Sequence, residues 1–282
     1  MLLYLRAIRV TSVVLAVLAS LHASNLKDLE KQAMMQFYGH HLLLSHPYVS
    51  NKLRFNSAGE LIGKSDEGPW TTTGILHLEN IEIKPNLIRV AGKREIIIVR
   101  SENGKLGMQP ISLTKRMEVE LVPAATIATL DDVKQTMGRV FHEENIGKKL
   151  NTYYRETVVL GGVDRKTDQV AIQGGDGGIF GYLNDNPVYF PGPEIRPAKV
   201  IHSENAEYTG AAAAKRTQGK MFMMVVVDEK GYPAIIHLLK DLGDNLDIQT
   251  LAATSQWRFT PAAKDGKPVA SVFDVGWEAV TY

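Results

Sequence analysis

Apolar and polar residues alternate in short runs from Val49 to Val122, and turn residues separate the runs. This spacing favours an antiparallel β meander. Gly59 closes one predicted turn, because glycine tolerates a positive φ, and the pair Asn103-Gly104 is typical of a tight hairpin. Two further strand-like segments follow before residue 184. The pattern predicts a mainly β N-terminal domain over residues 24–183.

One stretch inside this domain has the period of a helix instead. Thr129 can cap a helix whose third residue is Asp132, as in a capping box. The apolar residues that then fall on one face are Val133, Met137, Val140 and Phe141. We expect a helix at about 129–142 that packs on the β meander.

The C-terminal third has a different order of elements. Two dense apolar runs, 221–227 and 234–239, flank a turn that ends in Gly231. An alanine-rich segment over 206–216 favours a helix, and a second helix is expected to begin at Asp244, which can cap it together with Asp247. Strict alternation in the last strand predicts one face in the core and the other towards water or a partner.

These elements together predict an α+β module in which two helices cover one face of a three-stranded antiparallel sheet. We place the module at residues 198–282. The segment 184–197 before it holds four prolines, which lack a backbone donor and have a fixed φ, so it is expected to be an extended, Pro-rich linker.

Composition narrows the classes of function. The 282 residues include 32 basic and 31 acidic side chains, a balance that argues against nucleic-acid binding. The chain has no cysteine, which excludes disulfides and thiolate metal sites. His40, His41 and His46 have no carboxylate close in sequence and match no ligand spacing, so we predict no metal site there.

The same reading predicts no cofactor and no enzymatic activity. The glycines of 174–178 are not followed by the lysine that a phosphate-binding loop requires. No nucleophile elbow and no metalloprotease motif occurs, and His202 and His237 stand alone in the sequence. No catalytic residue is therefore predicted.

The N-terminus has the features of an export signal. Arg6 and Arg9 precede an apolar run from Val10 to Leu21, and Ala23 is a small residue suited to cleavage. The run is shorter than the roughly 17–25 residues that span a bilayer. We predict a signal peptide over residues 1–23, with a short uncleaved membrane anchor as the alternative.

The last part of the chain resembles the C-terminal domain of the TonB family. Three motifs carry the resemblance, and they stand in the family's order and spacing. They are VVVDEKG at 225–231, WRFTPA at 257–262 and KDGKPV at 264–269. The resemblance extends over about residues 193–282. It implies that the protein is located in the periplasm or cell envelope of a Gram-negative-type bacterium.

The resemblance also implies a partner and a site. Members of the family support energised transport across the outer membrane, and their C-terminal sheet binds the TonB box of a TonB-dependent receptor by strand addition. An exposed strand edge offers unpaired backbone groups to an extended peptide. We therefore expect the last strand to be the binding edge. The candidate partner-binding residues are Ser271, Val272, Asp274, Gly276 and Glu278.

Three departures from the family keep a second function open. Ser12, Ser20 and His22 do not give the serine-to-histidine spacing with which transducers engage an ExbB–ExbD motor. A folded β domain replaces the family's long Pro-rich segment, and Tyr208-Thr209 stands where Tyr-Pro is usual. Motor coupling requires an uncleaved N-terminus. The alternative is an envelope scaffold that uses the module for oligomerisation, for example as a homodimer.

Overall fold

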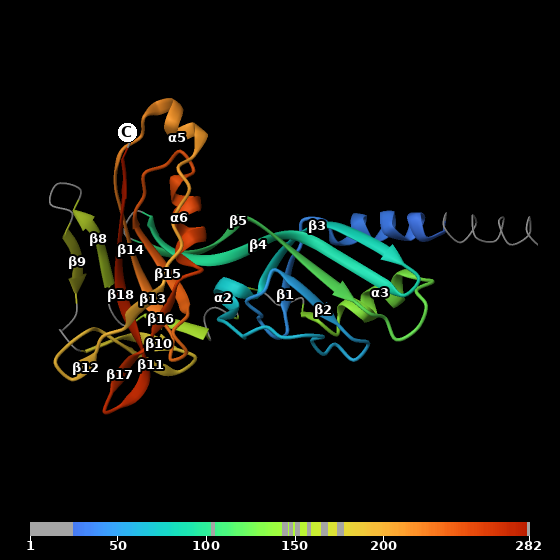
Figure 1. The fold of residues 1–282 in the computed structure, drawn as a ribbon, viewed down its shortest axis with the longest axis horizontal. Helices are drawn as coiled ribbons and strands as arrows, with labels where there is room; N and C mark the ends of the chain where they lie inside the picture. The colour runs from blue at the N-terminus through green and yellow to red at the C-terminus, as the bar shows by residue number, and fades with distance from the viewer. Residues whose placement is uncertain are drawn as a thin grey trace, which may run out of the picture.

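The computed structural model describes residues 25–102, 105–142, 146, 149, 153–156, 159–164, 169–173 and 178–280 (Figure 1). The predicted signal peptide, the predicted hairpin turn at 103–104 and most of the glycine run at 174–178 lie outside these residues. Within the described part, no helix combines the length and the apolar character needed to cross a bilayer. The fold is α+β, with many strands and few helices, as predicted.

Most strands belong to one continuous sheet with the order β6-β1-β3-β4-β15-β14-β18-β11-β10-β7. Strands β5, β2, β17 and β12 join it beside this path, whereas β13–β16 and β8–β9 are separate pairs. The strands before residue 184 are β1 (His41–Leu44), β2 (Lys52–Phe55), β3 (Ile75–Lys84), β4 (Leu87–Glu102), β5 (Lys105–Leu121), β6 (Phe141–His142), β7 (Tyr154–Glu156), β8 (Val159–Asp164), β9 (Gln169–Gln173) and β10 (Ile179–Leu183). The later strands are β11 (Asn186–Tyr189), β12 (Ile195–Arg196), β13 (Lys199–His202), β14 (Gly219–Val227), β15 (Pro233–Lys240), β16 (Arg258–Thr260), β17 (Ala262–Lys264) and β18 (Lys267–Ala279).

The N-terminal part is built on the antiparallel meander β3-β4-β5. The helix over residues 25–37 and α3 (Leu130–Met137) place their apolar side chains against its core. The capping box is present as predicted, because the Thr129 hydroxyl accepts from the Asp132 N–H and the Asp132 carboxylate accepts from the Thr129 N–H. The helix ends at Met137, earlier than predicted, since Phe141 pairs with Leu44 as part of β6.

The C-terminal module has the predicted arrangement. Its sheet runs β15-β14-β18 with antiparallel pairing, and α5 (Gly210–Lys215) and α6 (Leu246–Thr254) are its helices. Apolar side chains of β14, β15 and β18 share one buried cluster with Leu246 and Leu251 of α6. The fold class is therefore confirmed for both parts of the chain.

The start of α6 differs from the prediction. Its N-cap is Asn245, in a left-handed conformation and without a side-chain capping bond. Asp244 instead points back towards α5, where its carboxylate accepts from Lys215 Nζ and from Thr217 Oγ1, the latter at 2.6 Å. These two hydrogen bonds lower the pKa of Asp244. Asp244 therefore joins the two helices rather than capping one of them.

The turn after β14 lies against the WRFTPA run. Gly231 has a φ of +84°, and its carbonyl accepts from the Phe259 N–H at 2.9 Å. A Cβ atom on Gly231 would lie only 2.0 Å from the Phe259 carbonyl oxygen. Phe259 is itself buried in the module core. Two of the motifs that identify the module are thus in direct backbone contact.

The two parts of the chain are joined by strand pairing and not only by a linker. β4 pairs in parallel with β15 at Ile98–Ile236, and Arg100 and Asp241 form an ion pair of 2.5 Å just beyond. Short helix α2 (Trp70–Thr73) adds to this junction. Its Thr72 hydroxyl donates to the Pro233 carbonyl of β15 at 2.9 Å.

The proline-rich segment 184–197 is extended, but both of its ends belong to sheets. Val188 and Tyr189 of β11 pair in parallel with Ala270 and Ser271 of β18. β12 pairs with β17 in the antiparallel sense. Phe190 and Ile195 are buried. The segment therefore packs on the module instead of connecting it loosely, and the predicted domain boundaries at 183 and 198 remain a prediction.

Replacing Gly231 with alanine should destabilise the protein far more than replacing Gly266. Both glycines have a positive φ, but nothing lies within 4 Å of a Cβ at Gly266. Gly266→Ala should cost about 1–2 kcal/mol, the usual cost of a left-handed conformation. Gly231→Ala should cost roughly 1–3 kcal/mol more, because its methyl group overlaps a carbonyl. Urea unfolding of both variants measures the difference, and equal losses would contradict the contact with Phe259.

Candidate partner-binding edge

The outer side of β18 is covered at one end only. The side of β18 that faces β14, which we call its inner side, pairs with β14 from Ser271 to Ala279. On the outer side, β11 pairs with Ala270 and Ser271, and the residues before them, Lys267–Val269, pair with β17. Among the described residues, no strand pairs with the outer side from Val272 to Ala279. We call this stretch the open edge.

The predicted binding residues divide into two groups. Ser271 is covered by β11 and is only 1% exposed, so it is not part of the open edge. Val272 starts the open edge, but its side chain is buried in the core between β18 and the strands β10 and β11. Asp274, Gly276 and Glu278 are exposed. The sequence did not reveal the cover over Ser271, because the proline-rich segment was interpreted as a linker.

The opposite side of the module sheet is closed by the chain itself. The β15 residues Ile236, His237 and Leu238 pair with β4. His237 is buried, and its Nε2 lies 2.9 Å from the Tyr154 hydroxyl, while the Phe180 ring packs edge-on against the imidazole. Within the described residues, the three-stranded sheet of the module can therefore accept an added strand only along β18.

Aromatic side chains hold the open edge against α6. The Trp277 indole N–H donates to Thr254 Oγ1 of α6 at 3.3 Å. The rings of Trp257 and Trp277 are 6.0 Å apart, and those of Phe259 and Phe273 are 5.0 Å apart. Phe259 is buried in the core, while Trp257 is only partly buried. This packing makes β18 a rigid template, which lowers the entropic cost of binding an extended chain.

A cavity lies beside the C-terminal end of the open edge. Its volume is about 190 Å³, and Tyr208, Met221, Leu246, Trp277 and Val280 are among its lining residues. Two of these lining residues, Tyr208 and Val280, are large hydrophobic side chains that remain exposed. A strand added to β18 would place alternate side chains on this face of the sheet. The cavity is therefore suited to an apolar side chain of a bound segment.

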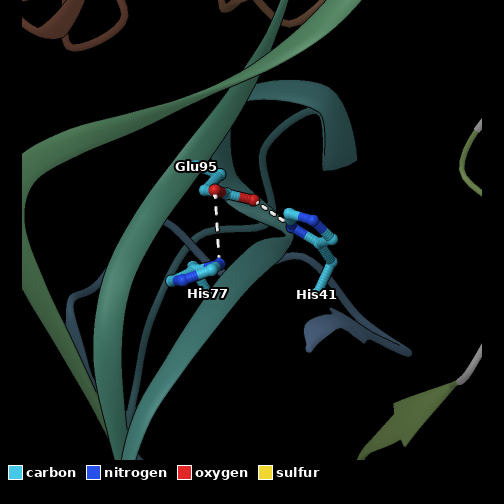
Figure 2. A group of neighbouring side chains, drawn as sticks. All are labelled: His41, His77 and Glu95. Atoms are coloured by element: carbon cyan, nitrogen blue, oxygen red, sulfur yellow. Dashed lines mark hydrogen bonds and ion pairs between the residues drawn. The ribbon is translucent and has the colours of Figure 1, made fainter. Parts of the chain in front are cut away.

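A second group of functional side chains lies elsewhere, in the N-terminal sheet. His41, His77 and Glu95 come from β1, β3 and β4 and point towards one another (Figure 2). His41 is close in sequence to His40 and His46, but His46 contacts Glu67, at 3.5 Å. His77 and Glu95 were missed, because only the pairing of β1, β3 and β4 brings them next to His41. His202 is exposed and lies 3.1 Å from Glu204.

Comparison with known proteins agrees with the architecture of the module. Residues 204–278 match the family model described as Gram-negative bacterial TonB protein C-terminal. A search of curated proteins found no match. The matched residues contain both α5 and α6 and the strands β14, β15 and most of β18.

Acidification should lower the free energy of unfolding through His237, which lies in β15 on the closed side of the module sheet. Burial lowers the pKa of His237 from 6.5 to about 3, so the folded protein keeps it neutral while the unfolded chain takes up a proton below pH 6.5. The stabilising contribution is complete above pH 6.5 and is lost as the pH falls towards 3. Between pH 7 and pH 5 this one group should remove about 2 kcal/mol from the free energy of unfolding.

Urea unfolding of the wild type and of His237→Gln at both pH values isolates this contribution, because glutamine does not titrate. The stability advantage of the wild type should shrink by about that amount at pH 5. An advantage that is the same at pH 7 and pH 5 would contradict a buried neutral His237.

Proposed function

We propose that this chain, whose residues 204–278 match the C-terminal domain of TonB, binds an extended segment of an envelope partner by strand addition to β18. The partner proposed is an outer-membrane TonB-dependent receptor, and the segment is its TonB box. In this role the protein supports energised transport across the outer membrane. The family is associated with the envelope of Gram-negative bacteria and with transport, and it is not an enzyme family.

One observation carries the proposal: β18 has an open edge, while β15 is already paired. An added strand gains main-chain hydrogen bonds only where N–H and C=O groups are unpaired. Residues Val272–Ala279 provide such groups on the outer side of β18, whereas β4 occupies the other side of the module sheet. Within the described residues, an added strand can therefore pair with the module sheet only along β18.

Side chains around the open edge would add selectivity. Asp274 and Glu278 are exposed and carry negative charge along the strand. Charged edge residues oppose pairing with unrelated strands, and a cation at the opposite position of a bound segment gains roughly 0.2–1 kcal/mol. An apolar side chain further along the segment would enter the cavity beside Trp277. We expect a bound segment to carry a basic residue opposite Asp274 or Glu278 and an apolar residue that points into the cavity.

The N-terminal segment determines whether a motor acts on this edge. If residues 1–23 are cleaved as a signal peptide, the protein is periplasmic and binds its partner without a direct membrane link. If they are retained, they anchor the protein in the inner membrane, where an ExbB–ExbD-type motor can engage it. Mass spectrometry of the protein from membrane and periplasmic fractions distinguishes the two forms.

Site-specific cross-linking tests the proposed edge. The chain has no cysteine, so a single introduced cysteine is the only thiol. Asp274→Cys, Gly276→Cys and Glu278→Cys should each form a disulfide with TonB-box peptides that carry one cysteine, taken from receptors of the same genome. Yields should depend on the cysteine position in the peptide, because a paired strand has a fixed register.

Lys230→Cys is the matched control, since Lys230 is exposed in the turn after β14, away from the open edge. It should give no register-dependent cross-link. Cross-linking that is equal at Lys230 and at the three β18 positions would contradict strand addition. Disulfides between two copies through Gly276→Cys, with no reaction with any peptide, would instead favour the oligomeric scaffold.

A further inference from the structure

Three ligand-type side chains meet on one face of the N-terminal sheet, about which the family match says nothing because it begins at residue 204. We propose that His41, His77 and Glu95 bind one divalent transition-metal ion of the zinc type. The proposal is independent of partner binding at β18.

The pairing of three adjacent strands creates the group. His41 on β1 lies directly opposite His77 on β3. Glu95 on β4 is opposite Ile75, two residues from His77 and therefore on the same face of the sheet. The β4–β5 pairing shifts register between Lys93 and Glu95. Such bulges re-aim side chains next to functional sites.

The distances are close to those of a metal site. One ligand atom from each residue lies within 4.8 Å of the other two. His41 Nδ1 is 2.5 Å from one Glu95 oxygen, and His77 Nδ1 is 3.7 Å from the other (Figure 2). Around a tetrahedral zinc ion with bonds of about 2.0–2.2 Å, ligand atoms are roughly 3.3 Å apart. Small side-chain rotations, on the order of 1 Å at the ligand atoms, would reach this geometry.

Two groups of the cluster favour a bound cation. The Glu95 side chain is only 4% exposed, and burying the charge of a carboxylate is costly unless a cation balances it. His77 Nδ1 is buried and has no hydrogen-bond partner among the described residues. Its 3.7 Å distance to Glu95 is too long for a hydrogen bond. A cation placed between the three side chains would satisfy both groups.

The types of ligand select the kind of ion. Two imidazole nitrogens and a carboxylate suit zinc and related first-row metals, whereas calcium and magnesium prefer oxygen ligands alone. Three protein ligands leave a fourth position for water or another ligand. Ser112 Oγ donates to Glu95 Oε1 at 2.7 Å, as residues behind metal-binding carboxylates commonly do. His41 and His77 are 40% and 32% exposed, which gives the ion access from solvent.

Calorimetric titration of the untagged full-length protein with zinc chloride tests the site. We expect one ion per chain and a rise in the thermal unfolding midpoint with zinc concentration, because an ion that binds only the folded state stabilises it. Glu95→Gln and His77→Asn should each weaken zinc binding by at least about 10-fold, because each removes a ligand. Cobalt(II) at the site should give the visible absorption of a tetrahedral complex.

His46→Asn is the matched control, since His46 is also beside a glutamate but lacks a third ligand. It should leave zinc affinity unchanged. Circular dichroism of each variant verifies that it is folded, and Glu95→Gln conserves the side-chain shape. Failure of the folded wild type to bind zinc at 100-fold molar excess would overturn the proposal. Binding that survives both Glu95→Gln and His77→Asn would overturn it as well.

Discussion

The parallel pairing between β4 and β15 is the interaction on which the arrangement of this protein depends. β4 is long enough to belong to two cores: Ile88 and Val90 pack in the N-terminal core, while Ile96 and Ile98 pack with the module. The hydrogen bond from Thr72 to Pro233 and the Arg100–Asp241 ion pair reinforce the junction. Because one strand serves both cores, the module is held by an extended sheet (Figure 1).

This junction determines which backbone groups of the module sheet remain available to pair with an added strand. A three-stranded sheet has two edges, and β4 removes the one at β15. The proline-rich segment then covers Ala270 and Ser271 at the start of the other edge. What remains is Val272–Ala279, supported from behind by Trp277 and α6. The same β4 strand contributes Glu95 to the proposed metal site, so that site and the junction share a strand.

Local signals in the sequence were sufficient for the elements but not for their long-range pairing. The capping box at Thr129 and the turn that ends in Gly231 depend on neighbouring residues, and the sequence predicts both. Asp244 was misread as a cap, because its partners Lys215 and Thr217 are distant in sequence. The cover over Ser271 and the meeting of His41 with His77 and Glu95 depend on strand order. No periodicity within a single strand encodes that order.

Residue-resolved amide hydrogen exchange measures the central claim, an open edge at β18 beside a closed one at β15. In the free protein, alternate amides from Val272 to Ala279 should exchange rapidly, because every second N–H of an edge strand points outward. The amides of Ile236–Leu238 should exchange slowly, and a bound receptor segment should slow only the rapid set in β18. Uniform protection of Val272–Ala279 in the free protein, or rapid exchange throughout Ile236–Leu238, would contradict the account.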